Sequence, residues 1–447
     1  MMKKMLLVLI LWTSLFTVIP TVTAQPVILT RRDQAKVIDE ILEDRLRTLL
    51  PGLMRREGLD MWVIISREYN EDPVIKTLLP ATWFAARRTT MLVVYDRGVE
   101  KGLEFLAVAR YDVGKVFRRA WDPDANPDQW AQLSKLIQER NPKKIGVNKA
   151  PGYGHADDLT ANDHDRLLEA LPARFRTNVV SAEKLSVSWL ETRSEREMAI
   201  YGQICRIAHD IIAEGFSEKV IQPGVTTTDD VVWWFRERIA ELKLDTWFQP
   251  SVSVQRNEEE ALTSKRPQPL VIMPGDLLHV DFGITYLRLN TDTQQHAYVL
   301  RGGETAVPEY LQAAFRQGNQ LQDLLTGNFR EGATGNEILK ATRNQAIAKG
   351  LKPSIYSHPI GYHGHAAGAS IGMWDNQENV PVTGDWPMHL NTAYSIELNN
   401  TAYVAEWKKE VRIMLEEDGY FDATGFRYID GRQREIMPIP RPSANRP

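Results

Sequence analysis

The sequence predicts two folded domains, an α/β domain followed by a larger domain that also combines helices with strands. The chain has 447 residues, more than an ordinary single domain contains. In both halves, short apolar runs of strand length alternate with segments whose apolar residues have helical spacing. The composition, 43% hydrophobic and 25% charged residues, is that of a folded protein and excludes widespread disorder.

The charge and the cysteine content bear on which partners the protein binds and on what stabilises its fold. The formal net charge is −4 and the sequence has no long basic run, so nothing in it indicates nucleic acid as a partner. The single cysteine, Cys205, cannot form a disulfide within the chain. The fold is therefore expected to depend on its hydrophobic core.

Residues 1–24 have the layout of a secretory signal peptide. The basic start MMKK precedes the apolar run LLVLILW, and small residues in VTA (22–24) precede Gln25. An uncleaved membrane anchor is the alternative, but three threonines, a serine and a proline interrupt the apolar run. The pattern predicts cleavage after Ala24, export to a periplasm or the cell exterior, and no membrane association afterwards.

Residues 27–185 are predicted to form the α/β domain. A helix is expected over 34–50, where apolar residues keep helical spacing. The expected strands, each bounded by Gly, Pro, Asp or Asn, are MWVIIS (61–66), MLVVYD (91–96), EFLAVARYD (104–112) and KKIGVN (143–148). This part has no cluster of His, Asp and Glu with the spacing of metal ligands, and its paired arginines are expected to lie on a surface.

The second domain is predicted to span residues 195–440. The charged stretch ETRSEREM (191–198) lies at its boundary, and Ser194 with Glu197 fits a capping box at the start of a long helix. Further helices are expected over 229–243, 308–325 and 334–349. After the first of them, a Pro-Gly-Asp turn leads into the apolar strand LLHVDFG (277–283).

Acidic residues inside predicted core strands are the main functional signal. Asp281 lies in LLHVDFG, and Asp292 follows eleven residues later. Glu397 lies in the apolar stretch TAYSIELN, and Glu410 begins EVRIMLEEDG. A buried carboxylate must be neutral, paired with a cation or bound to a metal. For one aspartate alone, a salt bridge would be the ordinary explanation.

Histidines strengthen the prediction of a metal site. Three of the nine histidines lie in HPIGYHGH (358–365), where Gly361 and Gly364 allow a close approach to a ligand. Several carboxylates with fewer histidines favour Mn, Co, Fe or Zn, and the excess of oxygen favours the harder ions. At least one of the three histidines is expected only to pack or to hydrogen bond within the loop.

In their order along the chain, these aspartates, histidines and glutamates resemble the ligands of the pita-bread metallopeptidases. That family includes methionine aminopeptidase, aminopeptidase P (Xaa-Pro aminopeptidase) and prolidase. The resemblance covers 195–440 and implies an α+β fold with a pita-bread catalytic domain. Residues 27–185 look more loosely like the smaller α/β domain that precedes it in the proline-directed branch, which also contains creatinase.

The resemblance implies a site for two divalent metal ions, expected to be Mn, with Co or Zn as alternatives. The implied metal ligands are Asp281, Asp292, His363, Glu397 and Glu410, and the implied catalytic groups are Glu397, His358 and His365. Glu397 would also move a proton, His358 would contact the substrate, and His365 competes for either histidine role.

The last ligand depends on how the final strand is aligned. The family shows Arg-Ile-Glu-Asp where this chain has VRIM (411–414). Matching the arginines puts Met414 at the ligand position. Matching the turn at Gly419 puts Glu410 there and Lys408 in place of the arginine. The second alignment keeps a carboxylate at the site and is therefore preferred.

Two histidines of the family have no evident counterpart. One usually stands well before the first aspartate, where this chain has EEEALTSKRP (258–267). His279 either replaces it or is a core histidine. The other follows the ligand histidine by about seven residues, and AAGASIGMWDNQ (366–377) lacks it unless His365 substitutes. These differences concern substrate and catalysis rather than metal binding.

The resemblance implies hydrolysis of the bond before proline in a peptide or dipeptide, by a homo-oligomer, expected to be a dimer. Three tryptophans could line a proline pocket or simply pack in the core: Trp374, Trp386 and Trp407. Two other functions stay open, a metal-independent creatinase-like amidinohydrolase and a non-catalytic binding protein on the same fold.

Overall fold

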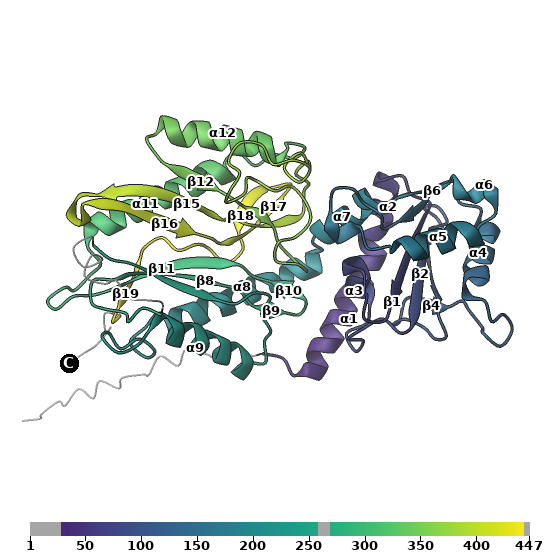
Figure 1. Ribbon diagram of the computed structural model, residues 1–447, viewed down its shortest axis with the longest axis horizontal. Coiled ribbons are helices and arrows are strands. Elements are labelled where there is room, and N and C mark those ends of the chain that lie inside the picture. The colour runs from purple at the N-terminus through teal and green to yellow at the C-terminus, as the bar shows by residue number, and fades with distance from the viewer. Residues whose placement is uncertain (1–27, 258–268, 442–447) are drawn as a thin grey trace, which may run out of the picture.

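The computed structural model describes residues 28–257 and 269–441, which form two lobes with separate β-sheets (Figure 1). The first lobe contains α1 to α7, and the second begins at α8. In the described part of the chain, no helix is both long and apolar enough to cross a membrane. The predicted signal segment lies outside the described residues, and the predicted domain boundaries stay predictions.

The first lobe is a six-stranded sheet covered by helices on both faces. The strands follow the order β4-β3-β2-β1-β5-β6. Their bounds are β1 Met61–Arg67, β2 Thr89–Asp96, β3 Leu103–Val108, β4 Arg118–Arg119, β5 Ile145–Val147 and β6 Val179–Ser181. Along β1, Trp62 and Ile64 join one apolar cluster while Met61, Val63 and Ile65 join the other, because successive side chains point to opposite faces.

The helices of this lobe divide between those two clusters. Helices α1, α2, α3 and α7 contribute to the first cluster, and α4, α5 and α6 contribute to the second. Their bounds are α1 Arg31–Thr48, α2 Leu50–Arg56, α3 Pro73–Leu78, α4 Gln129–Arg140, α5 Ala161–Ala170, α6 Ala173–Arg176 and α7 Glu183–Glu191, and a 3-10 turn covers Gly154–Ala156. The predicted α/β composition of this part is confirmed.

A buried ion cluster connects the two lobes. Helix α8 (Glu195–Gly215) begins with the predicted capping box of Ser194 and Glu197. The Glu197 carboxylate also accepts hydrogen bonds from Arg45 of α1 and from Arg193. Burial alone would raise the pKa of Glu197, but Arg193 and Arg45 together lower it below its ordinary value. Helix α1 is thereby tied to the start of helix α8.

The second lobe packs three sheets between two layers of helices (Figure 1). One sheet has the order β19-β11-β8-β7 (β7 Ser251–Gln255, β8 Leu277–Phe282, β11 Thr293–Val299, β19 Met437–Ile439). The second has the order β12-β15-β16 (β12 Pro353–Ile355, β15 Leu398–Val404, β16 Lys409–Leu415). The third has the order β13-β14-β17-β18 (β13 His358–Pro359, β14 Thr392–Ser395, β17 Asp418–Asp422, β18 Gly425–Tyr428). A small hairpin adds β9 Thr285–Tyr286 and β10 Leu289–Asn290.

Two apolar clusters hold these layers together. Helices α8 and α9 (Thr228–Glu241) pack with β8 in one cluster. Helices α11 (Glu309–Thr326) and α12 (Gly335–Ala348) pack with β15 and β16 in the other. The predicted mixture of helices and strands in this part is confirmed.

Three chain segments cross from the second sheet to the third, and each is interrupted at the crossing. The interruptions separate β12 from β13, β14 from β15, and β16 from β17. Residues at or next to them are His358, Glu397 and Glu416. Because neighbouring strands are interrupted at corresponding positions, side chains of three segments converge between the sheets.

Candidate metal centre

Five side chains from five segments of the second lobe converge near the points where the strands are interrupted. Asp281 lies on β8 and Asp292 immediately precedes β11. Ligand atoms of Asp281, Asp292 and Glu416 lie within 4.8 Å of one another, and so do those of His358, Glu397 and Glu416. Glu416 belongs to both groups, so the five residues form one cluster.

The atoms that face one another in this cluster are mostly without partners. Oδ1 of Asp281, Oδ1 of Asp292 and Nε2 of His358 are buried and make no hydrogen bond. Nδ1 of His358 donates to the Pro359 carbonyl at 2.9 Å, so Nε2 carries a lone pair. Nε2 lies 3.7 Å from Oδ2 of Asp292 and 3.8 Å from Oε1 of Glu416. Unpartnered oxygen and imidazole nitrogen atoms around one point fit a divalent metal site.

Electrostatics support the same fit. Burial raises the pKa of Asp281 to about 7. Burial, with repulsion from neighbouring carboxylates, raises the pKa values of Asp292, Glu397 and Glu416 well above their ordinary range. In the described part of the chain, no lysine or arginine forms an ion pair with any of these four groups. Two divalent cations would balance four ionised carboxylates, since +4 and −4 cancel.

The structure contradicts the prediction that Glu410 is a ligand. Glu410 lies at the outer end of β16, exposed and ion-paired with Lys352. Glu416 occupies the ligand position that was predicted for Glu410. Met414 lies outside the cluster. Even-numbered side chains of β16 share one face, which is exposed at Glu410 and becomes buried only where Glu416 pairs with Gln294 of β11.

Neither alignment considered for this strand included Glu416. The available signal was its place directly after Leu415, the last buried apolar residue of β16, where the chain enters the buried acidic run Glu416 to Asp418. Glu416 lies where this strand leaves its own sheet. The position along the strand therefore mattered more than the flanking arginine or glycine.

The histidine roles also differ from the prediction. His358 belongs to the cluster, whereas the ring of His363 packs against His155 with the ring centres 4.9 Å apart. Gly364 approaches Trp247 so closely that an added Cβ would lie 2.4 Å from its ring, so the His-Gly pair reflects packing in this loop. The prediction of His363 as a ligand is therefore contradicted, and His358 replaces it.

His365 lies at the open edge of the cluster. One ligand atom of His365 is within 4.8 Å of ligand atoms of Asp292 and His358, and its ring centre lies 4.7 Å from that of His358. With His358 as the ligand histidine, His365 stands seven residues later, where the family carries its second histidine. The histidine that was expected about seven residues after the ligand histidine is therefore His365.

His279 is a core histidine, as one of the two alternatives predicted. Its Nε2 lies 2.8 Å from Oε1 of Gln294, and burial lowers its pKa to about 4. Gln294 carried no signal in the sequence. The stretch EEEALTSKRP (258–267), which lacks the other histidine of the family, lies outside the described residues.

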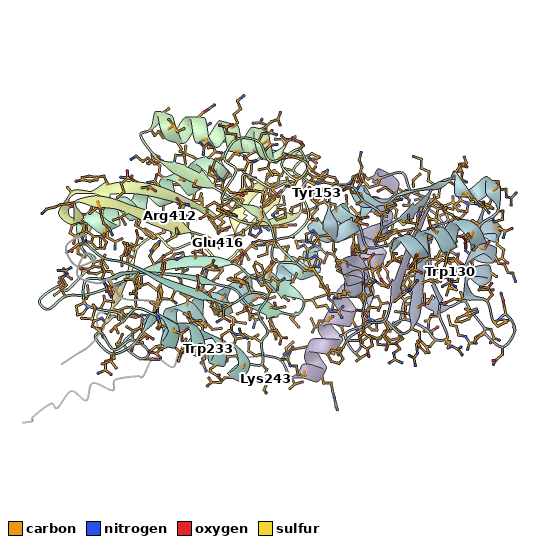
Figure 2. The ribbon with its side chains drawn as sticks, viewed as in Figure 1. Trp130, Tyr153, Trp233, Lys243, Arg412 and Glu416 are labelled. Carbon is orange, nitrogen blue, oxygen red and sulfur yellow. The ribbon has the colours of Figure 1, made fainter. Side chains whose placement is uncertain are left out.

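A pocket of about 430 Å³ opens beside the cluster and reaches both lobes. Its lining from the second lobe includes Glu397, His358 and His365, and residues 152–155 of the first lobe line it from the other side. Figure 2 shows Tyr153 at the junction of the lobes and Glu416 inside the second lobe. A molecule in the pocket would therefore contact both lobes and the metal cluster.

The three predicted tryptophans occupy different environments. Trp374 lines the pocket and is largely exposed. Trp386 packs edge to face against Tyr153, with ring centres 5.2 Å apart. Trp407 is buried in a core cluster. Only Trp374 is thus among the pocket-lining residues.

Comparison with known proteins identifies the second lobe. A model of metallopeptidase family M24 matches residues 199–418, a segment that contains all five cluster residues. The chain carries an M24 metallopeptidase domain. A comparison with curated protein sequences gave no match.

Solved structures resemble the chain over both lobes. X-Pro aminopeptidase from Thermotoga maritima MSB8 has a TM-score of 0.61 at 16% identity and covers 87% of this chain and 99% of its own. Xaa-Pro dipeptidase from Bacillus anthracis has a TM-score of 0.55 at 16% identity, covering 92% and 100%. Zinc-substituted Escherichia coli aminopeptidase P in complex with product has a TM-score of 0.56 at 12% identity, covering 91% and 97%. The predicted α+β fold, an M24 pita-bread domain preceded by a further domain, is confirmed.

The cluster of five side chains predicts opposite effects on metal content for substitutions of two glutamates, Glu416 and Glu410. Glu416→Gln keeps the shape of the side chain but removes a charge shared by both ligand groups, so we expect it to lose at least one metal ion after dialysis. Glu410→Gln should keep the metal content of the wild type. Elemental analysis of both variants gives the measurement, and the reverse result would contradict the assignment of Glu416.

The raised pKa values predict that metal-free protein becomes less stable as pH rises. Above the unfolded aspartate pKa of about 3.9, the folded state holds more protons than the unfolded state, so stability falls through the folded value of about 7 and beyond. The lowered pKa of His358 affects the stability of the folded state only below about pH 6.5, where an unfolded histidine takes up a proton. Melting temperatures from pH 7 to 9 should fall without metal, and stabilisation by added Mn²⁺ should increase.

A second acid pair requires a control in that experiment. Burial raises the pKa of Asp72 to about 6 and that of Asp158 to about 8 in the first lobe, which acts in the same direction. Asp158→Asn removes most of this contribution without touching the cluster. Stabilisation by Mn²⁺ that does not change with pH in this variant would contradict the prediction.

Proposed function

We infer that the protein is a dinuclear metallopeptidase that removes an amino-terminal residue from in front of proline. The observation that carries this conclusion is the cluster of unpartnered ligand atoms in the wall of a pocket large enough for a short peptide. The inferred ligands are Asp281, Asp292, His358, Glu397 and Glu416. Mn²⁺ is the proposed ion, with Co²⁺ and Zn²⁺ as alternatives, because oxygen ligands predominate.

The metal ions, when bound, supply a water of lowered pKa and polarise a carbonyl oxygen. Glu397 lies both in the cluster and in the pocket wall, so its carboxylate can take a proton from water and deliver it to the leaving amine. Gln294 holds Oε1 of Glu397 at 2.6 Å. The other oxygen remains for the proton transfer.

We propose that His365 orients the substrate. It lines the pocket, and burial lowers its pKa below the ordinary histidine value, so the ring is neutral at neutral pH. A neutral imidazole can donate a hydrogen bond to a substrate carbonyl without adding charge beside the metal ions. This role replaces the catalytic role predicted for His358.

Proline specificity is proposed from the pocket lining and from the structural neighbours. Tyr153, Ala366, Met373 and Trp374 offer apolar surface for a pyrrolidine ring. Three neighbours with this two-lobe fold are named as an X-Pro aminopeptidase, an Xaa-Pro dipeptidase and an aminopeptidase P. Both peptides and dipeptides are therefore candidate substrates, and the implied homodimer stays a prediction.

The function is tested by incubating metal-free protein with Mn²⁺, Co²⁺ or Zn²⁺ and a series of peptides. Xaa-Pro peptides or dipeptides should release their first residue, and matched peptides with alanine in place of proline should not. Glu397→Gln cannot accept a proton, so kcat should fall on the order of 10²- to 10⁴-fold. A protein with two bound ions and no cleavage of any Xaa-Pro substrate would favour a different amide substrate or a binding role.

We also propose that the protein is exported, because MMKK, the apolar run and VTA (22–24) form a signal-peptide pattern. Sequencing of the amino terminus of protein from its native host should begin at Gln25. Recovery of chains that begin at Met1 from the cytoplasm would exclude this proposal.

A further inference from the structure

Gln294 contacts two proposed ligands through one amide group. Its Nε2 donates to Oε1 of Glu397 at 2.6 Å and to Oε2 of Glu416 at 2.8 Å. Backbone hydrogen bonds run in both directions between Gln294 and Glu416, at 3.0 and 3.3 Å. In the pairing of β8 with β11, Gln294 lies opposite Asp281. A residue without metal-binding chemistry of its own is thus adjacent to three of the ligands.

The orientation of this amide is determined by its neighbours. In the ionised state that metal binding requires, carboxylate oxygens only accept hydrogen bonds, so the NH₂ group faces Glu397 and Glu416. Oε1 then faces Nε2 of His279 at 2.8 Å, which requires a hydrogen on that nitrogen. Nδ1 of His279 is left to accept from the Ser253 hydroxyl at 3.3 Å. Ser253, His279 and Gln294 therefore form one chain of hydrogen bonds with a single consistent direction.

A neutral donor suits this position better than a cation would. Glu397 and Glu416 lie at interruptions of different strands, so without a shared partner their mutual repulsion would separate them. An arginine there would hold both carboxylates, but its charge would oppose the binding of two divalent cations. The glutamine amide supplies two hydrogens and no net charge.

We propose that Gln294 is a positioning residue of the metal centre, which holds Glu397 and Glu416 at the separation and orientation that metal binding requires, and that His279 fixes its amide. The proposal rests on the metal centre of the proposed function but not on the substrate. Residues that orient metal ligands through hydrogen bonds typically change metal affinity by roughly 10- to 100-fold when replaced.

The adjacent glutamine provides a matched control. Gln295 is also buried, lies on the same strand, and donates from Nε2 to a carboxylate, that of Glu417, at 3.1 Å. Its side chain points to the opposite face of β11. Gln294→Met and Gln295→Met therefore remove the same group from neighbouring positions, and only the first loses contact with proposed ligands.

Calorimetric titration of the metal-free full-length proteins with Mn²⁺ is the measurement. Gln294→Met should bind Mn²⁺ roughly 10- to 100-fold more weakly than the wild type, and Gln295→Met should bind as the wild type does. Equal affinities of the two variants would overturn the proposal.

The variant Gln294→Asn tests whether any amide at this position is sufficient or whether the amide must reach both carboxylates. Asparagine keeps the amide but is one methylene shorter, so it cannot reach both carboxylates, and metal binding should be weakened again. Wild-type affinity in this variant would overturn the proposal, and the same variant decides if Gln294→Met fails to fold. Peptide cleavage by the wild type is measured in a separate experiment. If the wild type cleaves no Xaa-Pro peptide, the substrate proposal fails, but the comparison of Mn²⁺ affinities still tests the role of Gln294.

Discussion

Mutual repulsion among four buried carboxylates is the constraint on which the second lobe depends. Ligand atoms of Asp281, Asp292, Glu397 and Glu416 lie within two overlapping groups no more than 4.8 Å across, without an ion-paired arginine or lysine in the described chain. Such an arrangement persists only if protons or cations neutralise it, because ionised groups cannot be buried alone. The fold must also prevent the side chains from turning away, and its sheets and helices provide that rigidity.

The fold meets this constraint by taking ligands from sheets that face one another. Strands β8 and β11 present the two aspartates from the sheet backed by α8 and α9. The three interrupted segments present His358, Glu397 and Glu416 from the sheets backed in part by α11 and α12. The backbone bridge between Gln294 and Glu416 joins these two sets directly. Packing of the two apolar clusters therefore sets the distance between the ligand sets.

The sequence allowed prediction of Asp281, Asp292 and Glu397 as ligands, but it missed Glu416 and gave His358 a substrate role instead of a ligand role. Asp281 and Glu397 stand out because a carboxylate within an apolar run needs an explanation, and both reach the cluster. Glu410 stands at the head of an apolar run, yet its strand begins in solvent, which no local pattern records. His358 and Glu416 depend on where neighbouring strands are interrupted. That is a property of pairing between segments far apart in the chain.

At the junction of the lobes, first-lobe residues that line the pocket contact the loop that contains His358 and His365. The described metal ligands all lie in the second lobe. The Tyr153 hydroxyl donates to the Gly368 carbonyl at 2.8 Å, which fixes the first-lobe side of the pocket to the chain that follows His365. Arg193, bound to Glu197 at the junction, packs so closely on Gly361 that an added Cβ would lie 2.6 Å from Nη1. The ion cluster that ties the lobes together thus also supports the loop between His358 and His365. Pocket shape is therefore determined by both lobes, whereas the described metal ligands all come from one. Changes at the junction should alter substrate binding more than metal affinity.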